Sequence, residues 1–441
     1  MIPARLIVKK RDGGSLTEAE WAAFFQGYMA GEVEDYQVAA LLMAIYFRGM
    51  EPAETRTLTR IMIESGERWT WPDDGGPMGD KHSTGGVGDK VSLILAPLCA
   101  ACGVRLPMVS GRGLGHTAGT LDKLETIPGL RTDLEKADYD RLVDEVGFAM
   151  GGQTGTFAPL DRETYALRDV TGTIESIPLI TASIMSKKLA EGLDGLVLDV
   201  KWGDGAFLRE RGRAEELARS MIEVGVSFGV RTEALLTDME NPLGRTVGHA
   251  LELREAIEVL RGEDPEPRLL EVTTALAERL LVLTGAAPGE DEARRAVHEA
   301  LRGPAFDRFL AMVRAQEGDP APIEDTDQLP RAPVRLELTA PAGAFLAGLP
   351  ARRVGRLLVE LGGGRRVKGD EIDRSVGFVF PRALGDRLEP GEPWAIVHAR
   401  DGAGAEKARA VLESIVEWSE EPVVPRPAIT ARISREEDPP A

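Results

Sequence analysis

The sequence predicts an α/β fold class: a small all-helical domain, a larger α/β domain with a central, mostly parallel sheet, and a C-terminal α+β domain. Three observations predict it. Helical patterns with short links fill much of the first 66 residues. Short apolar runs then alternate with long helical patterns, which is typical of a parallel α/β sheet. After a stretch rich in proline and aspartate, strands and turns dominate.

The N-terminal unit contains three helical patterns. The first, 17–31, opens with TEAE, in which Thr and Glu three residues apart form a capping-box pattern. The second covers 35–49 and the third 51–66, and both end at a glycine. Helices with such short links predict one small helical bundle.

The middle of the chain alternates strands and helices. The runs VRLPMVS (104–110) and GLVLDVK (195–201) are short, apolar and followed by polar or glycine-rich residues. Helical patterns occupy 213–229 and 242–262. Because ligands usually bind at the carboxyl ends of parallel strands, we expect the functional loops there.

The C-terminal part begins after 318–335, a stretch that predicts a linker. Residues 376–399 predict two strands separated by turns, and the segment GDRLEPGEPWAIVHA is similar to a biotinyl- or lipoyl-type β-hammerhead. No Met-Lys-Met attachment site occurs there, so we expect a structural role. The last eight residues, 434–441, are predicted to be disordered.

The chain has 441 residues and a net charge of −19, which argues against a nucleic-acid polymer or an anionic membrane surface as partner. Between residues 80 and 123 the sign of the net charge reverses, with five Lys and Arg residues against three Asp residues. This reversal predicts a local pocket for a small anion. The N-terminus lacks the apolar run of a secretory signal, and the run 93–104 is too short to span a bilayer, so we expect a cytoplasmic protein.

Two cysteines, Cys99 and Cys102, form a C-x-x-C pattern. A zinc site needs about four ligands, and the chain has no second pair of cysteines. A redox pair is a second interpretation. We favour a third, in which two small side chains pack on a buried helix.

Two loops of glycine and hydroxyl residues carry most of the functional argument: DKHSTGGVGDKVS (80–92) and SGRGLGHTAGTLDK (110–123). A nucleotide P-loop is excluded because its glycine and lysine spacing does not occur. GLGHTA (113–118) does fit the dinucleotide pattern, with Asp133 following 20 residues after Gly113. The segment before Asp133 does not resemble a strand, which argues against this interpretation.

We favour a phosphate site formed by both loops. Glycines let backbone N–H groups approach an anion, and Lys81 supplies a full charge. Helices that begin at the hydroxyl residues would add favourable dipoles. Tight turns with helix caps are the alternative. The hydroxyl donors are Ser83, Ser92, Ser110 and Thr120.

A third stretch, 165–192, carries Arg168, Ser183 and Lys187. Ser183 and Lys187 are four residues apart, so they share one face of a helix. The helix is apolar around them, which indicates that the lysine points toward a ligand. The alternative is a surface serine and lysine on an amphipathic helix.

Together these motifs resemble the pyrimidine-nucleoside phosphorylase family. The matching segments are 80–92, 110–125 and 165–190, and the likeness extends over nearly the whole chain. The second motif departs from the family at Ala118, where glycine is usual. The extra methyl group matters only if that residue needs a positive φ.

The resemblance implies a domain for each part of the chain. Residues 1–69 with 157–190 would form the helical domain, which binds the pyrimidine and dimerises. Residues 70–156 with 191–329 would form the α/β domain, which binds phosphate, and 330–441 the C-terminal domain. The resemblance also implies a homodimer whose two substrate-binding domains close on each other.

The implied reaction is phosphorolysis of a pyrimidine nucleoside to the free base and an α-pentose 1-phosphate, with phosphate as co-substrate and no other cofactor or metal. His82 would transfer a proton or donate a hydrogen bond, because an ordinary histidine pKa of about 6.5 suits this. His82, Arg168 and Lys187 would be catalytic. The implied phosphate contacts are Lys81, Ser83, Ser92, Ser110 and Thr120. The implied base contacts are His82, Arg168, Ser183 and Lys187.

Two further positions bear on specificity. Met108 stands where family members that also accept uridine tend to carry Lys, which suggests a preference for thymidine and deoxyuridine; simple core packing is the alternative.

Some members bind a monovalent or calcium cation, and here Lys90 replaces a small hydroxyl residue. Its ammonium would reach Glu255 in place of the ion, or it would be an exposed lysine. The positions concerned are Gly88, Lys90, Leu243, Thr246 and Glu255.

Other functions stay open at this point. Within the same enzyme group, a broad-specificity phosphorylase would also accept uridine. A phosphoribosyltransferase of the same superfold would need Mg²⁺ and carboxylates near the loops, for which Asp89 and Asp122 are the candidates. A non-catalytic nucleoside- or phosphate-binding regulator would need a damaged catalytic set, and the positions above are intact.

Overall fold

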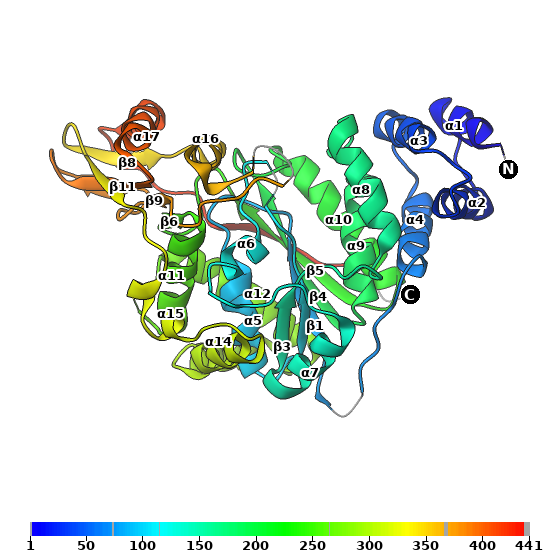
Figure 1. Ribbon diagram of the computed structural model, residues 1–441, viewed down its shortest axis with the longest axis horizontal. Coiled ribbons are helices and arrows are strands. Elements are labelled where there is room, and N and C mark those ends of the chain that lie inside the picture. Colours follow the sequence, from blue (N-terminus) through cyan, green and yellow to red (C-terminus); the bar gives the residue numbers. More distant parts are fainter. Residues whose placement is uncertain (1, 73–74, 114, 264, 366–368, 436–441) are drawn as a thin grey trace.

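The computed structural model describes residues 2–72, 75–113, 115–263, 265–365 and 369–435. Figure 1 shows helices of the N-terminal part at one end of the molecule, the α/β domain in the centre and the C-terminal domain at the other end. The predicted three-part α/β fold is therefore confirmed.

The helical unit joins two separate segments of the chain. Leu160, Leu179 and Ala182 from the second segment share a buried apolar core with side chains of the first. The predicted capping box is present, since the Thr17 hydroxyl accepts a hydrogen bond from the Glu20 N–H at 3.3 Å. The helices are α1 (Pro3–Arg11), α2 (Glu18–Met29), α3 (Asp35–Arg48), α4 (Pro52–Glu64), α8 (Pro159–Thr171) and α9 (Ile177–Ala190).

The central sheet is mostly parallel, as predicted. Strands β1 (Gly79–Ser83), β4 (Gly195–Trp202) and β5 (Arg231–Asp238) lie side by side and parallel. Strands β2 (Leu106–Val109) and β3 (Phe148–Gly151) form a second parallel pair. A parallel bridge between Met78 and Arg105 joins this pair to the beginning of β1. The carboxyl ends of β1 and β2, where the two glycine loops start, therefore lie at one edge.

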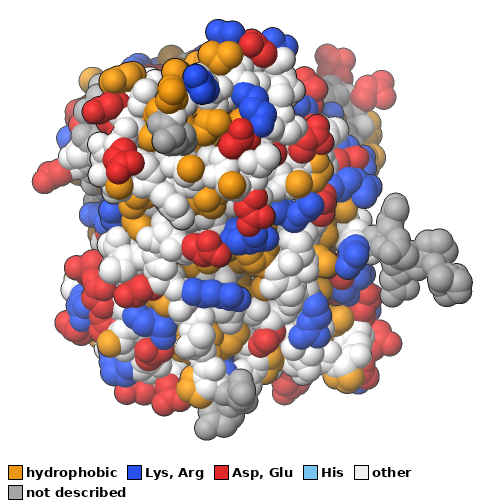
Figure 2. Space-filling view, turned by 90° about the vertical axis from the view of Figure 1, so that its right-hand side faces the viewer, with side chains coloured by type: hydrophobic (Ala, Val, Ile, Leu, Met, Phe, Trp, Pro, Cys, Tyr) orange, Lys and Arg blue, Asp and Glu red, His pale blue; other side chains and the backbone are white. Residues whose placement is uncertain are grey.

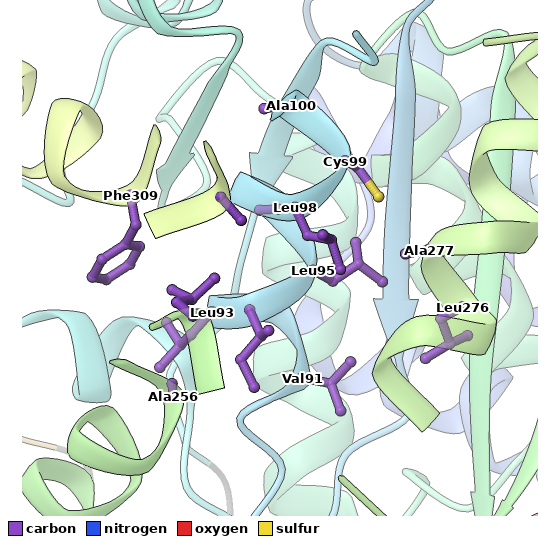
Figure 3. Packing of buried hydrophobic residues seen from close by; sticks show 14 of the residues in the cluster. Val91, Leu93, Leu95, Leu98, Cys99, Ala100, Ala256, Leu276, Ala277 and Phe309 are labelled. Carbon is purple, nitrogen blue, oxygen red and sulfur yellow. The ribbon is translucent and has the colours of Figure 1, made fainter. Parts of the chain in front are cut away.

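Helices cover the sheet of the α/β domain (Figure 1). The central one, α5 (Val91–Ala101), buries nine of its eleven residues. Figure 3 shows its side chains between Phe309 on one side and Leu276 on the other. Each fully buried Leu or Val contributes about 1.5–3 kcal/mol, so this packing fixes the loop that leads into α5. The other helices of the domain are α6 (Thr120–Leu124), α7 (Lys136–Val146), α10 (Arg211–Ser227), α11 (His249–Leu260), α12 (Pro267–Thr284), α13 (Glu290–Ala300), α14 (Pro304–Ala315), α15 (Ala321–Glu324) and η2 (Thr326–Gln328).

The C-terminal domain has two small antiparallel sheets flanked by helices, which agrees with the α+β prediction. One sheet has the strand order β6-β9-β11-β7 and the other β10-β8-β12. The strands are β6 (Thr246–Val247), β7 (Val334–Thr339), β8 (Ala344–Gly348), β9 (Gly377–Val379), β10 (Arg387–Leu388), β11 (Pro393–Ala399) and β12 (Glu417–Ser419). The helices are α16 (Ala351–Leu358), η3 (Val359–Gly363) and α17 (Gly402–Ile415).

Three local expectations were wrong. The expected linker 318–335 contains α15 and η2, because Ile323 and Leu329 are buried in the central core. The helix expected at 242–262 begins only at His249, because β6 first pairs with β9 of the C-terminal domain.

The third correction concerns the end of the chain. Strand β13 (Ile429–Ile433) falls within 330–441, yet it leaves the C-terminal domain and pairs antiparallel with β5 of the central sheet. Figure 1 shows this red strand crossing the middle of the molecule. The predicted disorder of the tail falls largely on 436–441, which lie outside the described residues. No helix in the described ranges is long and apolar enough to cross a bilayer.

Candidate active site

A cavity of about 410 Å³ lies between the helical unit and the carboxyl end of the central sheet. Strand β1 and its loop supply one wall, and helices α8 and α9 supply the opposite wall. All four side chains expected to contact a base line it, together with Ser83 of the phosphate set. Among its other lining residues are Thr84, Gly111, Arg112, Gly113, Gln153, Asp161, Tyr165 and Phe207.

Lys187 is held at the cavity wall by three contacts. Its ammonium donates to the Asp161 carboxylate, to the Ser183 carbonyl at 2.7 Å and to the Ser183 hydroxyl at 3.1 Å. The Lys187 side chain is 20% exposed, whereas that of Asp161 is 3% exposed. The ammonium is therefore fixed in direction at the wall of the cavity.

Arg168 is anchored by backbone carbonyl groups. Its guanidinium donates to Thr173 O at 3.3 Å, Ile174 O at 2.7 Å and Leu179 O at 3.0 Å. Burial lowers the pKa of Arg168 to about 10, so the side chain stays cationic at neutral pH. Three of the five N–H donors of a guanidinium are used in this way, and the remaining two can serve a ligand in the cavity.

His82 stands opposite these cations on strand β1. Burial and then the positive charges of Lys188, Lys187 and Lys81 lower its pKa well below the usual value. The imidazole is therefore neutral at pH 7. The pKa of His82 thus lies below the ordinary histidine value, which favours the hydrogen-bonding role over proton transfer of the two roles that the sequence suggested.

The residues proposed for phosphate come from four neighbouring elements. Lys81 and Ser83 lie on β1, Ser92 on the first turn of α5, Ser110 directly after β2, and Thr120 at the first position of α6. The Lys81 ammonium lies 3.4 Å from the Ser92 hydroxyl. The structure thus gathers these groups at the same end of the sheet, although of the five only Ser83 borders the cavity.

A buried ionic network occupies this region. The Lys81 ammonium lies 3.3 Å from Asp199, and Lys201 contacts Asp199 at 2.8 Å and Asp89 at 3.7 Å. The Ser83 hydroxyl donates to Asp89 at 2.6 Å. Burial opposes ionisation of Asp89, but the surrounding lysines and Ser83 lower its pKa strongly. The cations of the phosphate region are therefore already paired with carboxylates of the protein.

Lys188 connects helix α9 to both glycine loops. Its buried ammonium donates to Asp80 at 2.5 Å, to Glu191 at 2.7 Å and to the Val109 carbonyl at 3.0 Å. Asp80 begins the first loop motif and Val109 immediately precedes the second. Burial raises the pKa of Glu191 well above its usual value, although the Lys188 ammonium opposes this rise. This cluster fixes the helical unit against the ends of β1 and β2.

The second glycine loop is not a dinucleotide fingerprint. Asp133 lies exposed in a loop rather than at the end of a strand, so the weak dinucleotide interpretation was wrong. His116 on this loop contacts Gly205 O through its Nε2 at 2.9 Å. In the described residues the non-glycine positive φ values are at Ala158 and Glu317, so Ala118 accommodates its methyl group without backbone strain.

Lys90 is buried, and the interpretation as an exposed lysine was wrong. Its ammonium lies 2.6 Å from the Glu255 carboxylate, 3.0 Å from Leu243 O and 3.1 Å from Thr246 O. Gly88, with φ +74, lies against the Leu243 and Thr246 carbonyl groups. An ammonium group thus occupies a cage of three oxygens.

Two other residues belong to the core. Met108 is 1% exposed on β2 within the central apolar cluster and does not line the cavity, so it packs in the core.

Cys99 is a free thiol buried in the same cluster (Figure 3), and burial raises its pKa well above the usual value. The described residues contain no cluster of His, Cys, Asp and Glu that could hold a metal ion. Cys102 is partly buried and packs against the same cluster as Cys99, which agrees with the packing interpretation of the two cysteines.

Sequence reasoning missed several site residues. Asp161, Tyr165 and Phe207 line the cavity, and Lys201 and Asp199 form a buried ion pair next to Lys81. The last two stand near the end of the apolar strand GLVLDVKW, where a charged residue is a signal for a functional group. Asp161 gave no local signal, because its role depends on the partner lysine 26 residues away.

Comparison with known proteins assigns the three parts of the chain. Residues 75–305 match the α/β domain of the glycosyl transferase family, and residues 4–66 match its helical bundle domain. Residues 345–419 match the pyrimidine nucleoside phosphorylase C-terminal domain.

Whole-length relatives agree with this assignment. A thymidine phosphorylase of Rhizobium meliloti (strain 1021) is 47% identical over 436 residues, 98% of this chain and 99% of that protein. A pyrimidine-nucleoside phosphorylase of Staphylococcus aureus (strain N315) is 44% identical over 395 residues, 89% of this chain and 91% of that protein.

A solved structure shares the fold. The anthranilate phosphoribosyltransferase of Thermus thermophilus superposes with a TM-score of 0.57 at 22% identity, covering 70% of this chain and 98% of that chain. The sequence matches extend further, over the C-terminal domain as well. The chain therefore belongs to the glycosyl transferase family and, within it, to the group of thymidine and pyrimidine-nucleoside phosphorylases.

Proposed function

We propose that the protein is a pentosyltransferase that catalyses the reversible phosphorolysis of pyrimidine nucleosides to the free base and an α-pentose 1-phosphate. One observation carries the proposal: His82, Arg168, Ser183 and Lys187 surround a single cavity that also borders the first glycine loop. The names of the relatives agree with this reaction.

The side chains on the base side of the cavity can stabilise a pyrimidine that leaves as an anion. As the glycosidic bond stretches, the sugar becomes cationic and negative charge develops on the leaving base. Arg168 and Lys187 offer charged donors at fixed positions, which stabilise this charge more in the transition state than in the ground state. Ser183 and neutral His82 add uncharged hydrogen bonds. The base thus leaves as a stabilised anion without being protonated first.

The phosphate half supplies the nucleophile. Phosphate attacks the anomeric carbon from the face opposite the base, and its oxygens also stabilise the cationic sugar. Lys81 and the hydroxyls of Ser83, Ser92, Ser110 and Thr120 are the proposed contacts. Approach of the two domains excludes water, which would otherwise hydrolyse the sugar.

The test is release of base by the purified protein. Thymidine is incubated with and without inorganic phosphate, in the absence of magnesium, and thymine is quantified. The proposal predicts release only with phosphate. Release that requires Mg²⁺ and a pyrophosphate-bearing sugar would indicate a phosphoribosyltransferase instead, and binding without release would indicate a regulator.

We also propose a preference for 2′-deoxy substrates, that is, thymidine and deoxyuridine over uridine. The support is the relatives named thymidine phosphorylase, of which the one from Rhizobium meliloti (strain 1021) is 47% identical. Met108 does not line the cavity, so any contribution it makes acts through packing behind the second loop. Equal kcat/KM for uridine and thymidine would establish a broad-specificity phosphorylase.

We further propose a homodimer formed through the helical unit. All but one of the exposed large hydrophobic side chains in the described part of the chain lie on this unit, including Phe47 at 75%, Tyr36 at 71% and Val170 at 79%. Figure 2 looks onto this side of the molecule, and hydrophobic side chains gather in its upper part. An exposed apolar group of this kind is typical of an interface between proteins.

Sedimentation of single variants tests the dimer. Phe47→Glu is expected to shift the protein toward monomer, because a charge in an apolar interface is costly. Val424→Glu is the matched control, since Val424 is 90% exposed but lies near the C-terminal end of the chain. A wild-type protein that sediments as a monomer at micromolar concentration would exclude the proposal.

We propose that Lys90 takes the place of a bound cation, so that no metal ion is required. The three oxygens around its ammonium support this. The wild-type rate is expected to be independent of potassium, whereas Lys90→Ser is expected to become potassium-activated. Strong potassium activation of the wild type would contradict the proposal.

A cytoplasmic location is likewise our proposal, and cell fractionation tests it.

A further inference from the structure

The short helix α6, which starts at Thr120, is held from outside its own domain. Arg365 of the C-terminal domain places two N–H groups on the Asp122 carboxylate, at 2.7 Å to Oδ1 and 3.1 Å to Oδ2. The Asp122 side chain is 1% exposed. Such a forked pair fixes both partners in direction as well as in distance.

The same carboxylate holds the second glycine loop. Asp122 Oδ2 accepts a hydrogen bond from the backbone N–H of Gly113 at 2.7 Å. Gly113 and its neighbours Gly111 and Arg112 line the cavity. Two consecutive hydrogen bonds therefore lead from the C-terminal domain to the cavity wall.

A second arginine supports the same helix. Arg374 donates to the Asp122 carbonyl at 3.2 Å and to the Glu125 carboxylate at 2.7 Å. Glu125 in turn contacts Arg112 at 2.7 Å. The middle of α6, at Asp122, and the residue that follows the helix, Glu125, are thus tied to the C-terminal domain.

The charge of Asp122 depends on these partners. Burial alone would raise its pKa, but the bonds from Arg365 and Gly113 keep the pKa below its ordinary value. Removing Arg365 would leave the buried Asp122 carboxylate with the Gly113 N–H and a longer, 3.5 Å contact to Arg112. Its direction would then be less constrained, which loosens the loop that Gly113 belongs to.

We propose that Arg365 is a positioning residue for phosphate: it orients Asp122, and Asp122 holds Gly113, so that the second glycine loop presents its N–H groups and hydroxyls in the geometry that phosphate requires. The proposal rests on the proposed function and gives the C-terminal domain a part in it. Arg365 itself touches neither the cavity nor the base contacts.

The competing explanation is that Arg365 only attaches one domain to another. In that case, removing Arg365 would lower the stability of the protein but would change the KM values for phosphate and thymidine by the same factor. A positioning role acts on the loop assigned to phosphate and leaves the base contacts on α8 and α9 unchanged. The ratio of the two substrate KM values therefore separates the explanations.

The experiment compares Arg365→Ala and Arg365→Lys with wild type. Arg400→Ala is the matched control, because Arg400 pairs at 3.0 Å with Asp373 inside the C-terminal part of the chain and is 68% exposed. KM for phosphate and for thymidine, the Kd of inorganic phosphate by calorimetry, and Tm are measured. Arg365→Ala is expected to raise the phosphate KM and Kd about tenfold or more and to leave the thymidine KM within about twofold. Arg365→Lys keeps the charge but not the fork, so it should be intermediate, and the control should match wild type.

Unchanged phosphate KM and Kd in Arg365→Ala, or an equal rise in both KM values, would overturn the proposal. If Arg365→Ala does not fold, Arg365→Lys decides, and a wild-type phosphate KM in that variant would overturn it. A wild type that releases no base contradicts the proposed function instead. Phosphate binding measured by calorimetry then still tests the positioning role by itself.

Discussion

The two sides of the proposed site differ in their lysines, since Lys187 lines the cavity and Lys81 does not. Lys187, on the base side, is 20% exposed and points its ammonium along the cavity wall while Asp161 holds it. Lys81, on the phosphate side, is fully buried and lies against Asp199. Both lysines are paired with an aspartate, but only Lys187 is open to a ligand in this state.

On the proposed assignment, this difference implies that the base side is preformed and the phosphate side is not. A base would meet Arg168 and Lys187 without breaking an internal ion pair. Phosphate would have to replace the Asp199 carboxylate next to Lys81 and take over the Ser83 hydroxyl, which here donates to Asp89. Such an exchange requires side chains to move, which fits a reaction in which two domains close.

The largest expected effect is on the base side. Arg168→Ala and Lys187→Ala are each expected to lower kcat about 10²–10³-fold, because each removes a charged donor from the developing anion. Tm is expected to fall for Lys187→Ala with the fold retained, because the buried Asp161 carboxylate loses its ammonium partner. Near wild-type turnover in either variant, measured with saturating thymidine and phosphate, would remove that residue from the catalytic set.

Lys81→Ala tests the phosphate side. We expect kcat/KM for phosphate to fall about 10²-fold, because a full positive charge is lost next to a dianion. The thymidine KM should stay close to wild type. Steady-state kinetics with each substrate varied in turn separates the two constants. A rise in the thymidine KM alone would show that Lys81 acts on nucleoside binding. It would contradict the separation of the site into base contacts and phosphate contacts.

The smallest effect concerns pH. Because the pKa of His82 is lowered, its imidazole stays neutral from pH 8 down to well below 6.5. kcat/KM should therefore show no inflection from His82 between pH 6 and 8. His82→Asn should lower the rate about tenfold at every pH in this range, without altering the shape of the profile. An acid limb near pH 6.5 that disappears in His82→Asn would show that the histidine titrates there and acts as a proton donor.

The same shift affects stability. An unfolded histidine takes up a proton below about pH 6.5, whereas folded His82 does not. Stability contributed by the neutral form is thus complete above pH 6.5 and is lost as the pH falls toward the folded pKa. Wild type should lose more stability than His82→Asn between pH 6.5 and 5, as measured by denaturant unfolding.

Local patterns predicted much of the fold. The cap at Thr17, the strands GLVLDVK and VRLPMVS and the helix at 213–229 follow from neighbouring residues, and the structure has them. The pairing of β13 with β5 does not, because it joins residues nearly 200 positions apart, such as Ile429 and Thr237. A short strand near a chain end carries no local signal for its partner.

The site residues, too, were predictable from local patterns, whereas their distant partners were not. The glycine loops and the Ser183–Lys187 spacing indicated which residue types would face a ligand. The sequence could not show which carboxylate neutralises each lysine, since Asp199 and Asp161 lie far along the chain from their partners. The lowered pKa of His82 was missed because its largest cause is burial in the folded protein, followed by the charges of three lysines from two elements.

The most direct test of the account is phosphorus NMR of the reaction mixture. Purified protein is incubated with thymidine and inorganic phosphate without magnesium, and thymine is quantified in parallel. The account predicts a new phosphate-ester resonance that grows in equal amount with thymine as inorganic phosphate is consumed. Thymine release without loss of inorganic phosphate, or no release at all, would contradict it.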